Sequence, residues 1–90
     1  MIVWTAAMTA PDLTHSDSGC AFTRAAAASA AAEAARTLAL AYGAPAGSEV
    51  TVTIDGHLTA RATVGLSPIG HIDPTPVLDI ADALDERTSP

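Results

Sequence analysis

The sequence predicts a small α+β domain with the element order β-α-β-β-α. In this fold a three-stranded mixed sheet carries a long alanine-rich helix and a short C-terminal helix on one face. Three observations predict it: twelve alanines within residues 21–42, alternation of apolar and polar residues over 49–64, and an apolar stripe with helical spacing over 76–86. Ninety residues suit one domain, which we expect to cover 1–86, with a frayed tail at 87–90.

Charge and composition exclude some classes of partner. The net charge is −6, and the chain has four arginines and no lysine. Binding to nucleic acid or to an anionic membrane needs a basic surface, so neither partner is expected. Abundant alanine without Lys, Asn or Gln is typical of a GC-rich genome, such as that of an actinobacterium or one of its phages. The single cysteine allows no internal disulfide, and no signal peptide or membrane span is expected, which predicts a cytoplasmic protein.

The first half of the chain predicts one strand, one loop and one helix. Residues 2–8 alternate as a strand, and residues 9–19 carry the polar breakers of a loop. The alanine-rich segment Ala21–Tyr42 is the strongest helix signal. Ser18 or Asp17 is expected to cap its start, and Gly43 to end it. One side of this helix is formed by Ala27, Ala31, Ala34, Leu38 and Tyr42.

Residues 49–64 predict a β-hairpin. A three-residue loop ending at Gly56 places apolar side chains on one face and polar ones on the other. The apolar face then comprises Val50, Val52, Ile54, Leu58, Ala60, Ala62 and Val64. The polar face comprises Glu49, Thr51, Thr53, His57, Thr59, Arg61 and Thr63. The strand at 2–8 is expected to run parallel to the strand that begins at 49, because a helical crossover joins them.

The C-terminal part predicts a loop followed by a short helix. Residues 65–75 are rich in Gly and Pro, and we expect Thr75 to be the N-cap and Pro76 the first residue of a short helix. The helix that follows has an apolar stripe of Val77, Ile80, Ala81 and Leu84. A helix of this length needs to pack against the rest of the domain in order to form.

Candidate chemical groups gather before the long helix. Asp12, His15, Asp17 and Cys20 offer a carboxylate, imidazole and thiol set that could surround a transition metal. Cys20 is also a candidate nucleophile if the helix N-terminus activates its thiol and His15 acts as base. The simpler interpretation is favoured: these are turn and capping residues, and Cys20 is an inert thiol. The pair His71 and Asp73 is likewise interpreted as part of a turn.

Two surfaces suggest contacts with other proteins. The threonine-rich face of the hairpin is flat and able to form hydrogen bonds, and an exposed strand edge can accept another strand. The C-terminal helix carries Asp79, Asp82, Asp85 and Glu86, which either face solvent or present negative charge to a basic partner.

The sequence therefore favours a non-enzymatic protein–protein interaction or assembly module that self-associates or binds another protein, without a cofactor. The reasons are the small supply of bulky apolar side chains and the lack of a catalytic set. The contact residues we expect are Ala31, Ala34, Leu38, Thr59 and Arg61. Two alternatives stay open: a metal- or thiol-dependent protein centred on the 12–20 loop, and an acidic inhibitor of a nucleic-acid-binding protein.

Overall fold

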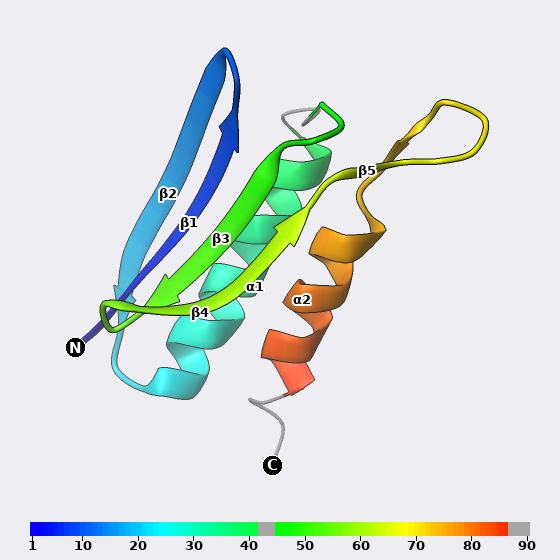
Figure 1. The fold of residues 1–90 in the computed structure, drawn as a ribbon. Coiled ribbons are helices and arrows are strands. Elements are labelled where there is room, and N and C mark those ends of the chain that lie inside the picture. Colours follow the sequence, from blue (N-terminus) through cyan, green and yellow to red (C-terminus); the bar gives the residue numbers. More distant parts are fainter. Residues whose placement is uncertain (42–44, 87–90) are drawn as a thin grey trace.

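The computed structural model describes residues 1–41 and 45–86 and is an α+β fold (Figure 1). The expected helix end at Tyr42 and Gly43 and the expected tail at 87–90 lie outside these residues. The strands and helices are β1 (Ile2–Ala10), β2 (Leu13–Ala21), α1 (Arg24–Leu40), β3 (Glu49–Ile54), β4 (His57–Thr63), β5 (Gly65–Leu66), β6 (Ile72–Asp73) and α2 (Thr75–Glu86).

The main sheet has four strands in the order β2-β1-β3-β4. Every neighbouring pair is antiparallel, so the predicted three-stranded mixed sheet is wrong in strand number and direction. The parallel crossover was expected between the first strand and β3. Instead, β1 is followed by the antiparallel strand β2 before the chain enters α1. In the sheet, β1 lies between β2 and β3.

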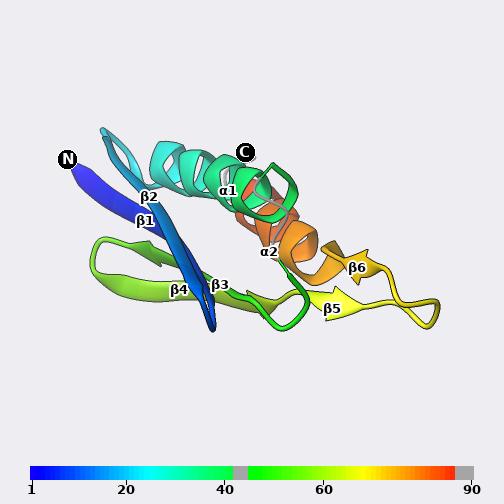
Figure 2. The ribbon, with the colours of Figure 1, turned by 90° about the horizontal axis from the view of Figure 1, so that it is seen from above.

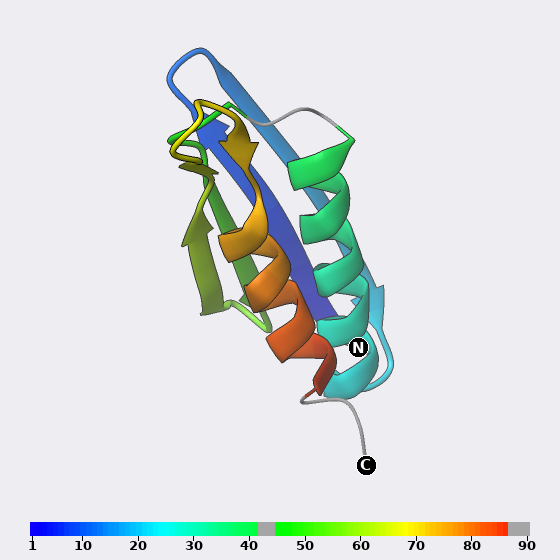
Figure 3. The ribbon, with the colours of Figure 1, turned by 90° about the vertical axis from the view of Figure 1, so that its right-hand side faces the viewer.

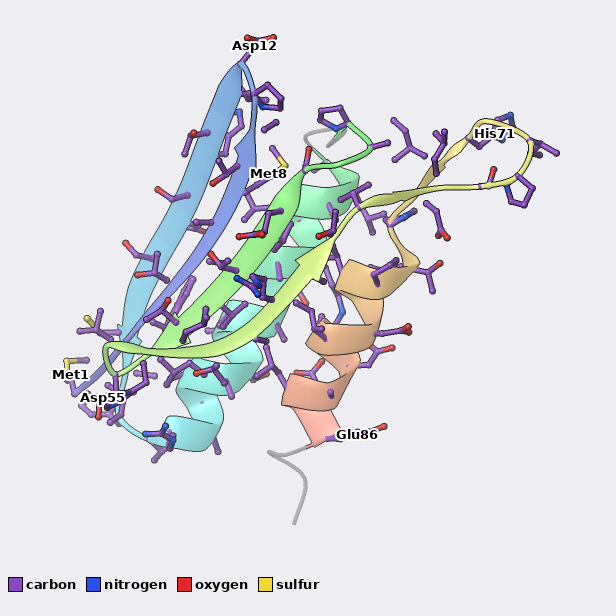
Figure 4. All side chains as sticks on the ribbon, viewed as in Figure 1. Met1, Met8, Asp12, Asp55, His71 and Glu86 are labelled. Atoms are coloured by element: carbon purple, nitrogen blue, oxygen red, sulfur yellow. The ribbon has the colours of Figure 1, made fainter. Side chains whose placement is uncertain are left out.

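The predicted loop at 9–19 contains most of β2. The segment has a polar composition because β2 lies at the sheet edge and only one of its faces is partly covered, so it lacks the apolar alternation that would predict a strand. Pro11 and Asp12 form the tight turn that joins β1 to β2, with Ala10 paired to Leu13. This turn lies at the far tip of the hairpin, where Asp12 is labelled in Figure 4.

Helix α1 begins three residues later than predicted. Its N-cap is Thr23, whose hydroxyl accepts a hydrogen bond from the Ala26 amide at 3.1 Å, as a capping threonine does. Neither Ser18 nor Asp17 caps the helix, since both belong to β2. Cys20 therefore lies in a strand and not in the first helical turn.

The β3–β4 connection also differs from the prediction. Asp55 and Gly56 form a two-residue turn with φ values of 55° and 78°, which is the type I′ geometry that Asp-Gly favours. A bulge at Thr59 then brings the apolar residues of β3 and β4 back to the same face. Thr53 pairs with Leu58, whereas the next residue of β3, Val52, pairs with Ala60. Leu58 consequently joins the polar face of the sheet and is exposed, contrary to its predicted apolar placement.

Both helices lie side by side on one face of the sheet (Figures 2 and 3). The core between the layers combines Trp4, Ala6 and Met8 of β1, three side chains of β3 and the alanines of α1. Val77, Ala81 and Leu84 of α2 close it. No helix in the described ranges is long and apolar enough to cross a membrane.

Beyond β4 the chain forms a projecting hairpin, residues 65–73, which we call the arm (Figure 1). Here the structure replaces part of the predicted loop with the short antiparallel pair β5–β6. Hydrogen bonds order its tip: the Ser67 amide donates to the His71 carbonyl at 2.7 Å and the Gly70 amide to the Ser67 carbonyl at 2.9 Å. At its base, Asp73 accepts a hydrogen bond from the Thr75 amide at 3.0 Å. Thr75 is thus the first residue of α2 and not its N-cap.

Candidate interaction surfaces

The four residues of the predicted metal or thiol site do not converge. His15 and Asp17 pair with Met8 and Ala6, whose side chains enter the core, so they lie on the helix-covered face of β2. Cys20 alternates to the opposite face, and Asp12 lies in the hairpin turn. Among the residues that the structure describes, no three His, Cys, Asp or Glu side chains are grouped to hold a metal ion.

His15 and Asp17 border a small hollow between β2 and α1. Its volume is about 190 Å³, and its α1 side is formed by Ala34, Thr37 and Leu38. Pockets that enclose a small-molecule ligand are larger, roughly 300–1,000 Å³. The hollow is therefore better described as the open seam between the edge strand and the helix than as a ligand site.

No element within residues 1–41 and 45–86 covers the sheet face turned away from the helices, and we call it the outer face (Figure 2). Strand alternation and register place small hydroxyl side chains over most of it, including the predicted Thr51, Thr53 and Thr63. The strand that the sequence did not reveal, β2, adds Thr14, Ser16 and Ser18. Larger apolar side chains, Val3 and Leu58, are exposed among them.

The arm carries three large exposed apolar side chains within residues 66–72. Leu66, Ile69 and Ile72 are 62%, 78% and 49% exposed. They lie on a hairpin of nine residues that projects from the body, with His71 near its tip (Figure 4). Sequence reasoning assigned this segment to a loop. The signal for it was the recurrence of large apolar residues among the Gly and Pro breakers.

The two edges of the sheet differ. At one edge, β4 is interrupted by the bulge at Thr59 and flanked by α2, and Thr59 and Arg61 border a second hollow against Ile80 and Leu84. At the other edge, β2 runs for nine residues without Pro or register shift, and its carboxylate, Asp17, lies on the helix-covered face. In the part of the chain that the structure describes, no element lies beside the outer edge of β2 (Figure 1). Natural proteins usually obstruct such an edge because it can pair with another strand.

The structure places the predicted contact residues in two different settings. Ala31, Ala34 and Leu38 are buried within the chain's own core, where the small side chains of α1 let the sheet and α2 approach closely. Helix α2 therefore covers part of the alanine-rich helix. Thr59 and Arg61 remain accessible on the β4 side.

The acidic residues of α2 are partly engaged inside the fold. Arg36 of α1 binds Asp82 at 2.8 Å and also Asp85, joining the two helices. These two hydrogen bonds raise the pKa of the Arg36 guanidinium further above its ordinary value. A surface that mimics nucleic acid requires outward-facing carboxylates, and here two of the four predicted ones face an arginine of the same chain.

Comparison of the chain with protein-family models, curated protein sequences and solved structures gave no match. The assignment of a function therefore depends on the surfaces themselves. They define a class of structure: a two-layer α+β domain with an open outer face, one unobstructed strand edge and an apolar arm.

Proposed function

We propose that this protein is a non-enzymatic interaction module that acts by self-association or by binding a larger protein partner. The observation that carries the proposal is the arm, where three large apolar side chains are exposed to solvent on one ordered hairpin. Burying such side chains is worth about 25 cal/mol per Å² of apolar area. Leu66 and Ile72 are cross-strand partners on this hairpin, and apolar side chains that are exposed together are typical of sites that another molecule covers.

The rest of the chain supports a protein-binding function and not a catalytic or metal-dependent one. The described His, Cys, Asp and Glu side chains do not gather into a metal-binding group. The exposed thiol of Cys20 lies on the outer face, across the sheet from His15. The outer face offers hydroxyl groups on a flat surface, which suits hydrogen bonding to a partner.

The test compares the wild-type protein with Leu66→Ser/Ile69→Ser in two measurements. One is sedimentation velocity over a wide concentration range, and the other is retention of proteins by the tagged chain. Leu40→Ser is the matched control, since Leu40 is a similarly exposed leucine that belongs to α1 and not to the arm. We expect at least one measurement to show association that the arm variant weakens and the control preserves. A wild-type monomer at every concentration, with identical retention by all three proteins, contradicts the proposal.

A further inference from the structure

We infer that β2 is the site at which two copies of this chain join, by antiparallel pairing of β2 with β2 of the second copy about a twofold axis at Ser16. The inference rests on the proposed contact function and specifies one partner for it. The joined sheets form one continuous eight-stranded sheet, with the helices of both copies on the same side.

The hydrogen-bond pattern shows which backbone groups of β2 face outward. The tight turn at 11–12 makes Ala10 and Leu13 a hydrogen-bonded pair, and hydrogen-bonded pairs recur at every second residue. The odd-numbered residues of β2 therefore bond to β1. On the far side of β1, the Asp55 amide donates to the carbonyl of Val3 at 2.8 Å, which confirms that the odd-numbered residues of β1 face β3.

The amides and carbonyls of Thr14, Ser16, Ser18 and Cys20 consequently point away from the sheet. The Ser18 amide agrees with this, because it donates to the Asp17 side chain at 2.9 Å and not to β1. Outward N–H and C=O groups that alternate along nine residues of regular strand form the template that strand addition uses. Pairing transfers the Ser18 amide from the Asp17 carboxylate to a carbonyl of the second copy.

The sequence of β2 selects one register. Antiparallel pairing about Ser16 sets Thr14 opposite Ser18 of the second copy, so that outward-facing residues meet outward-facing residues. It also sets His15 opposite Asp17 of the second copy, twice by symmetry, at non-hydrogen-bonded positions where side chains approach most closely. Leu13 then lies beside Gly19 of the second copy, next to the ring of Trp4.

The neighbouring registers are disfavoured by charge. Moving the axis to Asp17 places two carboxylates directly opposite each other, and moving it to His15 removes both contacts between His15 and Asp17. Like charges directly opposite each other destabilise a sheet. A register shifted by an odd number of residues would place the outward-facing backbone groups of one copy opposite groups of the other copy that are already bonded to β1. Charge and hydrogen-bond parity therefore agree on the Ser16 register, and an isologous twofold contact of this kind closes without forming a fibre.

The decisive experiment is register-specific crosslinking in a Cys20→Ser background. Ser16→Cys places two thiols on a hydrogen-bonded pair with Cα atoms about 5.5 Å apart, within the range that a disulfide spans. Thr14→Cys in the same background is the matched control, because the two copies of residue 14 then lie roughly 13 Å apart along the strands. We expect mild oxidation to give a covalent dimer with Ser16→Cys only.

A second variant tests the edge without thiols. Ser16→Pro removes an outward amide and leaves the β1–β2 hydrogen bonds in place, as proline at a strand edge does. It should convert the dimer to a folded monomer in sedimentation analysis. If Ser16→Pro disturbs folding, His15→Asp should weaken the dimer and His15→Asp/Asp17→His should restore it.

The outcomes separate this inference from the proposed function. Equal crosslinking at positions 14 and 16, or a dimer that persists with Ser16→Pro and with His15→Asp, overturns β2 pairing while self-association stands. A Cys20→Ser parent that is monomeric at every concentration also overturns it. In that case the proposed function is still tested by comparing the proteins that the wild type and the arm variant retain.

Discussion

The indole ring of Trp4 lies directly over Gly19 on the neighbouring strand. The two residues are cross-strand partners, and a Cβ atom added to Gly19 would lie 2.9 Å from a ring carbon. Trp4 is only 8% exposed, although it lies beside the sheet edge. The missing side chain at Gly19 thus creates the space in which the largest residue of the core is buried.

Gly19→Ala should therefore destabilise the fold by about 1–3 kcal/mol, the usual cost of forcing extra atoms into a packed site. Chemical denaturation followed by Trp4 fluorescence measures this directly, because the chain has a single tryptophan. Gly65→Ala is the control: a Cβ there lies 3.7 Å from its nearest neighbour, in ordinary contact. Equal stabilities for the two variants would contradict the packing role assigned to Gly19.

The bond between Arg36 and the acidic side of α2 gives a second prediction. Arg36→Gln removes the ion pairs that join α1 to α2 and should lower the free energy of unfolding by about 1 kcal/mol, as for a partly exposed charge network. Glu33→Gln is the matched control because Glu33 lies 3.5 Å from the same guanidinium and is largely exposed. Its effect in the same urea denaturation experiment should be smaller. A larger loss with Glu33→Gln would assign the stabilising contact to the wrong carboxylate.

The turn at Asp55 and Gly56 explains why the predicted three-residue loop between β3 and β4 is wrong. Side-chain parity alone favoured a three-residue loop, since a two-residue loop mixes the apolar and polar faces. The structure uses the two-residue loop and restores the faces with the bulge at Thr59. A bulge leaves no parity signal of its own in a single sequence, whereas Asp-Gly between apolar alternations is a direct signal for a type I′ turn.

Gly56→Ala should accordingly destabilise the protein by about 1 kcal/mol or more, because residue 56 has a φ of 78° that costs an L side chain energy. Asp55→Asn should be close to neutral, since Asn tolerates the φ of 55° at that position. Thermal unfolding of both variants measures the difference. A Gly56→Ala protein as stable as the wild type would be inconsistent with the type I′ turn.

The predictable parts of the fold were those with strong local patterns. Alanine content predicted α1, alternation predicted β3 and β4, and the stripe around Val77 predicted α2. Strand β2 lacked such a pattern because an edge strand with an open outer face needs few apolar residues. With β2 missing, the sheet lost a strand and β1 was given the wrong direction relative to β3.

The candidate surfaces were less predictable than the fold. The threonine face was recognised from β3 and β4, but its extension over β1 and β2 required the strand order. Helix packing by Ala31 and Ala34 was expected to involve another subunit, and both residues are buried against their own chain. Sequence periodicity identifies which face is buried, whereas only the fold shows which element covers it. The open β2 edge emerged from the structure alone, whereas the arm left one signal in the sequence, the recurrence of large apolar residues among its Gly and Pro breakers.

The Asp73 carboxylate gives a pH-dependent prediction. Its pKa is lowered by the hydrogen bond from the Thr75 hydroxyl and then by that from the Thr75 amide. A carboxyl whose pKa is lower in the folded state stabilises the fold above its unfolded-state pKa of about 3.9 and loses that effect as the pH falls through the folded-state value. The melting temperature of the wild type should exceed that of Asp73→Asn at neutral pH, and the gap should narrow below pH of about 4.

Thr75→Val separates the two hydrogen bonds, because it removes the hydroxyl that is the larger cause of the lowered pKa and keeps the amide. The pH at which the stabilisation by Asp73 disappears should then move upward, toward the ordinary value of a carboxyl group. Melting curves of the three proteins from neutral to acidic pH measure this movement. A gap between wild type and Asp73→Asn that stays constant through the acidic range would show that Asp73 acts at the start of α2 by its shape and not by its charge.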